Sequence, residues 1–310
     1  MKIGLVLSGG LAKGAYQAGF LRAITRRPQL NITAISASSI GLLSGYAFAA
    51  DKTDLLYSMW QDMHFDSTAD LLFSVWFKHF LRDKVKILIS ESDEVKVPVY
   101  APVCYAPFLH LDYCRMNGKY QPKWYSFVRS AMSFPLVSGG IRFFRGQIAV
   151  DGGLMDNIPV QPLLFNEDLD LILALHFEAG YKPRKNYIEK GIPILDYDVS
   201  LHNMFRKHSF DFHNETLVSM LQSGEEYGDE ICTEVLGNGE FTLEQIKQAA
   251  EQKRTSEKQL RLDNITLDTW VRRANEVLYP LIKNEGGNVF DVVSKSKKKN
   301  HKGVNYEKMS

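Results

Sequence analysis

Ser39 is the side chain in this sequence whose surroundings are most typical of nucleophilic chemistry. It stands in the segment 37–41 (Ala-Ser-Ser-Ile-Gly), after an apolar β-branched run at 32–35 and before an apolar segment that predicts a helix. A strand that turns sharply into a helix can present one side chain only when the neighbours two positions away are very small, as in the G-x-S-x-G nucleophile elbow. Ser39 is therefore the candidate nucleophile, and Ala37 and Gly41 are its two small neighbours.

The helix expected after Ser39 would assist this chemistry. Its positive N-terminal end favours a negatively charged serine oxygen, and a backbone N–H there can help to bind an oxyanion. Ala37 replaces the first glycine of the elbow pattern, and alanine is the least obstructive substitute where no positive φ angle is needed. A small-x-Ser-x-Gly string also occurs in ordinary packing turns, so the assignment depends on the residues that accompany it.

A glycine-rich turn near the N-terminus is a second candidate element. The apolar run 3–7 predicts a strand, the segment 9–14 (Gly-Gly-Leu-Ala-Lys-Gly) a turn, and the segment 13–27 a helix. Such a turn exposes backbone N–H groups at a helix N-terminus and binds anions. A dinucleotide site would need an acidic residue about 20 positions further on, and a P-loop would need a Lys-Ser/Thr pair. Both are missing, so an oxyanion hole is favoured over a phosphate-binding regulatory protein, with Gly9, Gly10 and Leu11 as the expected N–H donors.

Asp151 is the candidate base. It follows a short predicted strand at 148–150 and is followed by Gly152 and Gly153, which present no side chains and so allow a close approach to a serine. A carboxylate is poorly matched to the high pKa of a serine hydroxyl, so we expect modest turnover unless desolvation raises the pKa of Asp151.

Two further residues have alternative roles. His176, at the end of a predicted strand, is the one well-placed histidine after Asp151 and could complete a Ser-His-Asp esterase, although a packed structural imidazole is the more common finding at such a position. Lys13 is expected to be a solvated or structural cation, with an oxyanion or a lipid phosphate as the alternative partner.

The alternation of strand and helix patterns predicts the α/β class. We expect a three-layer sandwich with a mainly parallel central sheet, because the run 170–177 is continuously apolar, as in strands buried on both faces. Paired strands are predicted at 95–105 and 108–113, the second broken off at 117–119, and a helix at 122–132. The apolar run 69–81 predicts a buried packing helix, or alternatively a cap that touches lipid.

Strand patterns disappear after residue 200. Helices are predicted at 215–235, 242–262 and 266–282, the second opened by a Thr-x-x-Gln capping box. The expected organisation is a catalytic domain at 1–200, a helical C-terminal extension at 201–293 packed on it, and a basic, disordered tail at 294–310.

Composition narrows the class of protein. A hydrophobic content of 45% over 310 residues indicates a globular chain with a large core, and a net charge of +1 predicts no nucleic-acid partner. The three cysteines lack any Cys-x-x-Cys spacing, so neither a disulfide framework nor a zinc site is expected, and no cofactor is implied. The absence of a signal peptide pattern or an apolar span predicts a cytoplasmic protein, whose basic tail could contact membranes peripherally. The oligomeric state is left open.

The order of these elements resembles that of the patatin-like phospholipases. The resemblance covers residues 3–180 and includes 128–135 (Val-Arg-Ser-Ala-Met-Ser-Phe-Pro) and 150–160 (Val-Asp-Gly-Gly-Leu-Met-Asp-Asn-Ile-Pro-Val). It implies a lipid acyl hydrolase that works through a serine–aspartate dyad of Ser39 and Asp151. It also implies that the glycine-rich turn supplies the oxyanion donors.

Two residues depart from the family pattern. Leu11 and Ala37 stand where the family has glycines. Leu11 removes no N–H donor, but it can crowd the acyl group or disfavour the φ angle that aims the donor. A catalytically poor member that keeps the fold as a scaffold is therefore a further alternative.

Overall fold

The structure of the 310-residue chain is a computed structural model. It describes residues 1–63, 75–106, 110–133, 142–178, 181–201, 209, 211–236 and 289–292. The strands are β1 (Ile3–Leu7), β2 (Ile32–Ala37), β3 (Glu94–Tyr105), β4 (His110–Lys119), β5 (Arg142–Phe144), β6 (Gln147–Asp151), β7 (Leu171–His176), β8 (Ile194–Asp198) and β9 (Val289–Asp291). The helices are α1 (Gly14–Thr25), α2 (Ile40–Ala49), α3 (Thr53–Gln61), α5 (Val75–Leu88), α6 (Trp124–Ala131), α7 (Gln161–Asn166), α8 (Lys185–Ile188) and α9 (Asn214–Leu236).

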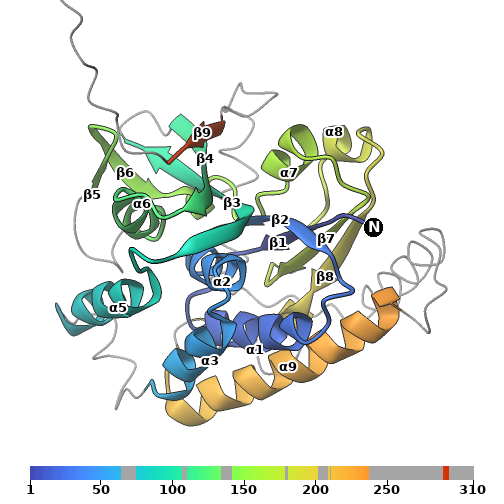
Figure 1. The fold of residues 1–310 in the computed structure, drawn as a ribbon, viewed down its shortest axis with the longest axis horizontal. Coiled ribbons are helices and arrows are strands. Elements are labelled where there is room, and N and C mark those ends of the chain that lie inside the picture. The colour runs from blue at the N-terminus through green and yellow to red at the C-terminus, as the bar shows by residue number, and fades with distance from the viewer. Residues whose placement is uncertain are drawn as a thin grey trace, which may run out of the picture.

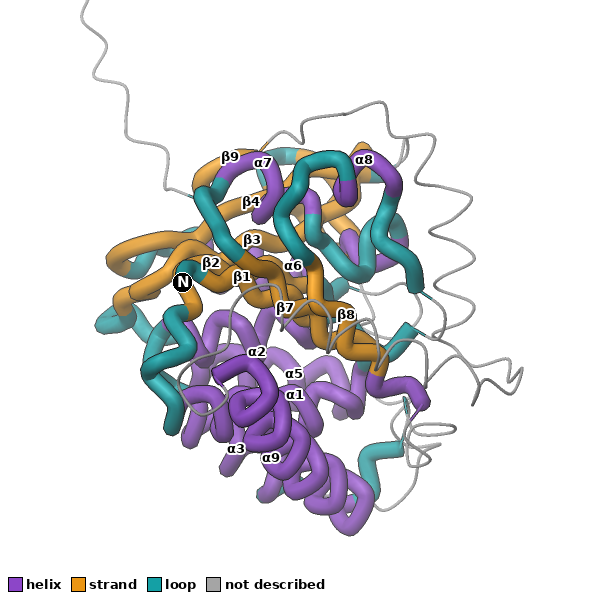
Figure 2. Tube along the Cα trace, turned by 90° about the vertical axis from the view of Figure 1, so that its right-hand side faces the viewer, coloured by secondary structure: helices purple, strands orange, loops and turns teal. Residues whose placement is uncertain are grey.

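These strands form one sheet with the order β5-β6-β3-β2-β1-β7-β8, and β4 pairs with both β3 and β9 (Figure 1). The strands from β3 through β2, β1 and β7 to β8 are parallel, whereas β4, β5 and β6 join by antiparallel pairing. Helices α1, α2, α3 and α9 lie on one side of the sheet, and α7 and α8 lie on the other (Figure 2). The predicted α/β sandwich with a mainly parallel sheet is confirmed.

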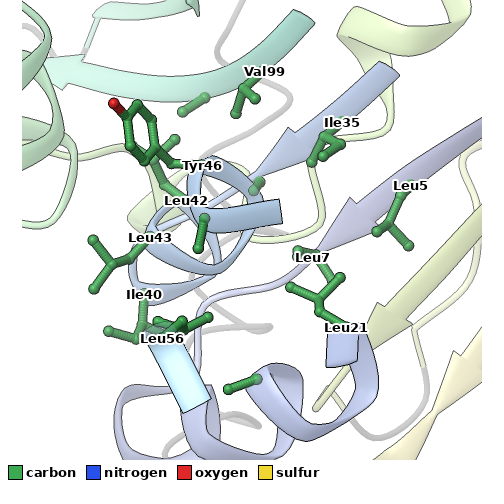
Figure 3. Close-up of a cluster of buried hydrophobic side chains, with 14 of the residues drawn as sticks. Leu5, Leu7, Leu21, Ile35, Ile40, Leu42, Leu43, Tyr46, Leu56 and Val99 are labelled. Carbon is green, nitrogen blue, oxygen red and sulfur yellow. The ribbon is translucent and has the colours of Figure 1, made fainter. Parts of the chain in front are cut away.

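The central strands are buried on both faces, and alternate residues serve different halves of the core. In β1, Leu5 and Leu7 join the cluster beneath α1 and α2, while Val6 joins the cluster beneath α7. Ile35 and the first residues of α2, beginning with Ile40, pack in the larger cluster with them (Figure 3). This apolar packing on both sides fixes the ends of β1 and β2, from which the candidate site is built.

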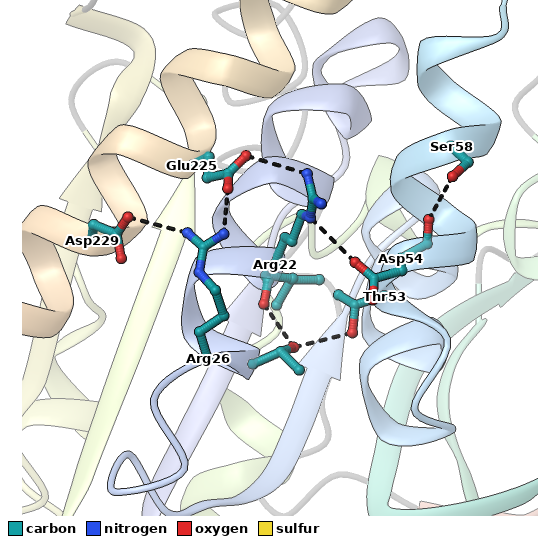
Figure 4. A network of polar contacts seen from close by, with 9 residues as sticks. Arg22, Arg26, Thr53, Asp54, Ser58, Glu225 and Asp229 are labelled. Atoms are coloured by element: carbon teal, nitrogen blue, oxygen red, sulfur yellow. Dashed lines mark hydrogen bonds and ion pairs between the residues drawn. The ribbon is translucent and has the colours of Figure 1, made fainter.

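Helix α9 packs along α1 at very short range. A Cβ added to Gly19 of α1 would lie 1.9 Å from the carbonyl oxygen of Leu221, and one added to Gly224 would lie 2.0 Å from that of Tyr16. Ion pairs border the contact: Arg26 meets Glu225 and Asp229 of α9, and Arg22 reaches both Glu225 and Asp54 of α3 (Figure 4). Glycine is therefore required on both helices for this approach.

Several expectations about elements need correction. A strand does occur after residue 200, because β9 pairs in parallel with β4, so the C-terminal region is not wholly helical. The pairing of β4 with β3 continues to Lys119, so the residues 117–119 do not end the strand. The register shifts between Val95 and Val99, and Gly118 has a positive φ angle. Strands β5 and β8 and helices α7 and α8 were not predicted. The predicted helices at 242–262 and 266–282 and the tail at 294–310 lie outside the described residues, as does the first part of the apolar run 69–81.

Candidate active site

Ser39 lies at the sharp turn between β2 and α2. Its backbone has φ 52° and ψ −126°, a conformation that costs energy in any residue except glycine and is typical of a strained functional turn. Gly41 makes the turn possible, because a Cβ there would lie 2.6 Å from the carbonyl oxygen of Leu7. Ala37 is the last residue of β2 and does not have a positive φ angle, so its position does not require glycine. The local geometry is that of the predicted nucleophile elbow.

Asp151 ends β6 and is 1% exposed. Its Oδ1 accepts the N–H of Gly153 at 2.8 Å, whereas its buried Oδ2 has no hydrogen-bond partner in the described part of the chain. Burial raises the pKa of Asp151 to about 6, although the Ser39 hydroxyl and the Gly153 N–H act in the opposite direction. The Ser39 hydroxyl thus lies close enough to the Asp151 carboxyl to stabilise its ionised form.

The two glycines after Asp151 bring its turn against the elbow. A Cβ on Gly152 would lie 2.3 Å from the backbone of Pro102, and one on Gly153 would lie 2.6 Å from Ser38 Oγ. Either side chain would push the β6 turn away from β3 or from the serine elbow. The spacing Asp-Gly-Gly is therefore a steric requirement for bringing Asp151 to Ser39.

The glycine-rich turn lies beside the nucleophile. A Cβ on Gly9 would lie 2.9 Å from Ser39 Cβ. The Gly9 N–H donates to Asn157 Oδ1 at 3.0 Å, so the structure uses this predicted oxyanion donor elsewhere. The N–H groups of Gly10 and Leu11 have no acceptor among the described residues. Leu11 has φ 53°, so the leucine occupies a left-handed conformation that glycine would take more easily.

Lys13 and Gly14 support this turn from the start of α1. Lys13 is 1% exposed, and its Nζ lies 5.3 Å from the ring centroid of Phe177, so it is not a solvated cation. Gly14 allows close packing, since a Cβ there would lie 2.6 Å from both Ile40 and Trp60. Both residues therefore contribute to the close packing around the glycine-rich turn.

His176 lies fully buried at the end of β7. Its ring pairs with Asp196, whereas a triad would need it to lie between Ser39 and Asp151. Its Nε2 is paired with Asp196 of β8, and its Nδ1 lies 3.3 Å from the N–H of Glu178. Burial lowers the pKa of His176, but the negative charges of Asp196, Asp198 and Glu178 outweigh it and raise the value to about 9. Both ring nitrogens therefore face groups of the β7–β8 edge.

Asn157 and Glu178 are buried polar residues that the sequence did not single out. Asn157 contacts Gly9, and its Nδ2 donates to Glu178 Oε1 at 2.7 Å. The position of Asn157 within the Asp-Gly-Gly segment was visible, but its partners lie 148 and 21 residues away. In the described residues, no group of three or more His, Cys, Asp or Glu side chains is arranged to hold a metal ion, and no helix there is long and apolar enough to cross a membrane.

Comparison with known proteins shows the family of this chain. The sequence profile described as "Patatin-like phospholipase" matches residues 5–164, more than half of the chain. The chain therefore belongs to the patatin-like phospholipase family, whose members are lipid acyl hydrolases. The matched range includes the glycine-rich turn, the elbow and the Asp-Gly-Gly turn.

The similar curated proteins are Lysophospholipase NTE1 from two strains of Cryptococcus neoformans var. neoformans serotype D, JEC21 and B-3501A. Each is 30% identical over an alignment of 191 positions that covers 56% of this chain and 11% of the relative, so the chain spans only a small part of their length. Among solved structures, VipD from Legionella pneumophila aligns with a TM-score of 0.39 and 13% identity, covering 91% of this chain and 81% of that one.

Proposed function

We propose that this protein hydrolyses acyl esters of lipids through a serine–aspartate dyad, with Ser39 as nucleophile and Asp151 as base. The observation that carries the proposal is the buried Asp151 carboxyl, which lies next to a strained serine elbow and whose Oδ2 has no hydrogen-bond partner among the described residues. A base with a pKa of about 6 is better matched to its task than an ordinary aspartate, because it still ionises at neutral pH and holds a proton more readily.

The reaction needs only groups of this chain, an ester and water. As Ser39 Oγ attacks the acyl carbonyl carbon, its proton passes to Asp151 Oδ2, and the carbonyl oxygen becomes negatively charged. We assign the N–H groups of Gly10 and Leu11, together with that of Ile40 after the nucleophile, to this oxyanion. The alcohol leaves with the proton from Asp151, and water then releases the fatty acid by the same route.

The substrate is expected to be a lipid with an accessible acyl ester, and a lysophospholipid is the first to test because the curated relatives carry the name lysophospholipase. Leu11 is a large, partly buried side chain within the turn assigned to the oxyanion, so it should narrow the range of acyl chains. The apolar run 71–81 remains the proposed lining of an acyl channel, although its side chains lie outside the described residues.

A fluorophosphonate probe tests the proposal directly. The wild type should be labelled and should hydrolyse short p-nitrophenyl esters, with phospholipid or acylglycerol turned over more slowly or only with detergent. Ser39→Ala should lose both the label and the turnover, and Asp151→Asn should lose nearly all turnover while remaining folded. Labelling of wild type without turnover of any ester from short to long chain would favour a non-catalytic scaffold.

A further inference from the structure

Asn157 bridges the glycine-rich turn and the end of β7. Its Oδ1 accepts the Gly9 N–H at 3.0 Å, and its Nδ2 donates to Glu178 Oε1 at 2.7 Å. Asn157 is 7% exposed and Glu178 is 3% exposed, so water competes little for these hydrogen bonds. Three segments distant in sequence are thereby held together: the turn after β1, the turn after β6 and the end of β7.

The chemistry of this bridge allows only one orientation of the Asn157 amide. The Gly9 backbone N–H can only donate, and the carboxylate of Glu178 can only accept. A flipped amide would place its NH₂ group against the Gly9 N–H and its oxygen against the carboxylate. Glu178 therefore fixes the direction of the amide, and the amide fixes the Gly9 peptide.

The position of the Gly9 peptide matters because the turn contacts the candidate nucleophile and has a strained backbone at Leu11. The Gly9 backbone packs against Ser39, and the same added Cβ would lie 2.6 Å from Asn157 Oδ1. Leu11, two residues later, has φ 53°. A leucine in this conformation tends to relax to negative φ, and such a rotation would turn the neighbouring N–H groups.

We propose that Asn157 and Glu178 are positioning residues that hold the glycine-rich turn in the geometry that aims the Gly10 and Leu11 N–H groups at the oxyanion. The inference rests on the proposed acyl hydrolase function. Neither residue touches the substrate. Their effect is on the transition state, where the charge on the oxyanion is largest.

Steady-state kinetics of Asn157→Ala test this role. We expect kcat for a p-nitrophenyl ester to fall about 10- to 100-fold with KM changed less than about twofold, because the turn binds the transition state and not the ground state. Asn166→Ala is the control: its amide donates one hydrogen bond, to the Pro162 carbonyl at 2.9 Å, from the exposed end of α7. The control should keep kcat within about twofold. An Asn157→Ala enzyme with wild-type kcat would overturn the inference, while an inactive wild type would overturn the proposed function.

A reversed pair guards against general misfolding. Asn157→Asp can still accept the Gly9 N–H but faces Glu178 with a second carboxylate, so we expect a loss in kcat similar to that of Asn157→Ala. Glu178→Gln retains an acceptor oxygen and should stay within about threefold of wild type. The double variant restores one donor and one acceptor in reverse order, and its kcat should return to within about fivefold of wild type. If the double variant is as slow as Asn157→Asp, the bridge does not act as proposed.

The amide signal of Gly9 gives a readout independent of turnover. With ¹⁵N-labelled glycine, the Gly9 signal should shift upfield in Asn157→Ala as its hydrogen bond is lost, and return in the double variant. Its hydrogen exchange should accelerate in the same variants. An unchanged Gly9 signal in Asn157→Ala would overturn the inference whatever the activity of the wild type.

Discussion

At Asp151, burial and hydrogen bonding act on the same carboxyl in opposite directions. Removal from water raises its pKa, and the Gly153 N–H and the Ser39 hydroxyl lower it again by less. The result is a base that ionises near pH 6. His176 is as deeply buried, but the acidic groups beside it favour its charged form. The two candidate bases therefore ionise in different pH ranges, and a kinetic profile separates them.

The reaction rate should rise tenfold per pH unit below about 6 and level off above it, because only the ionised form of Asp151, with its pKa of about 6, can accept the serine proton. If His176 were the base, the rise would continue to about pH 9, the pKa of that ring. We would measure the rate of fluorophosphonate labelling from pH 4 to 10, since p-nitrophenyl esters decompose at high pH. A plateau reached only above pH 8 would contradict the dyad.

Asp151→Asn should stabilise the folded protein at high pH while removing turnover. The pKa of the folded carboxyl is raised from 3.8 to about 6, so ionisation of Asp151 costs stability; the cost is absent below about pH 4, grows between 4 and 6 and is complete above 6. We expect a gain of about 1 to 3 kcal/mol at pH 8, from about 1.4 kcal/mol per pKa unit, and none at pH 4. Urea denaturation at both pH values measures it. A variant less stable than wild type at pH 8 would show that Asp151 is held mainly for structure.

Among the elements, turns next to predicted strands were the easiest to anticipate. The sequence pointed to Ser39 and Asp151 as candidates because each stands between an apolar run and glycine, a pattern contained in a few consecutive residues. The bridge through Asn157 was not, because an amide side chain carries no local pattern and its partner Gly9 lies 148 residues away. The partner of His176 was missed for the same reason: Asp196 lies 20 residues away in β8, a strand of five residues that carries too little pattern to be predicted.

His176→Ala should therefore affect folding more than catalysis. It removes the ring that pairs with the carboxylate of Asp196, whose side chain is 6% exposed, and breaking a buried pair typically costs about 3 to 5 kcal/mol. We expect a clear drop in Tm but turnover per folded molecule within about fivefold of wild type. His213→Ala is the matched control, because His213 also pairs with an aspartate, Asp211, but its side chain is 51% exposed and that of Asp211 is 21% exposed, so the Tm should hardly change. A folded His176→Ala protein as inactive as Ser39→Ala would favour the triad.

Gly224→Ala should separate α9 from α1. The added Cβ would lie 2.0 Å from the Tyr16 carbonyl oxygen, and backbone on both sides leaves no room for a small adjustment. We expect a loss of about 1 to 3 kcal/mol of stability, against less than 0.5 kcal/mol for Gln222→Ala on the exposed side of the same helix. Chemical denaturation of both variants would test it, and equal stabilities would mean that the two helices adjust freely.

For the whole molecule, the class of the sheet could be predicted from the sequence, but its edge strands and the packing of its helices could not. Continuous apolar runs such as β7 predict a parallel sheet because both faces must be covered. Short edge strands such as β5 and β9, three residues each, carry too little pattern to be recognised, and they form because neighbouring strands supply the hydrogen bonds. The same holds for the contact of α9 with α1: each helix was predicted, but their association depends on glycines whose role appears only in three dimensions.

The domain boundary expected at residue 200 can be tested by truncation. We expect a chain ending after Leu201 to misfold, because it lacks α9, which covers α1, and β9, which pairs with β4. A chain ending after Val292 keeps both elements and should fold. Binding of a hydrophobic dye and probe labelling of Ser39 would compare them, and normal labelling of the shorter chain would establish 1–200 as an independent domain.

The family match ends at residue 164, whereas the helix that lies against α1 begins at Asn214. If the matched segment were moved into another scaffold, it would lack α9, so the side of α1 that contains Gly19 would be exposed. Because α1 begins where the glycine-rich turn ends, loss of this packing would loosen the proposed oxyanion donors. A chimera should thus include residues 214–236 from this chain, or a host helix with glycines spaced to match.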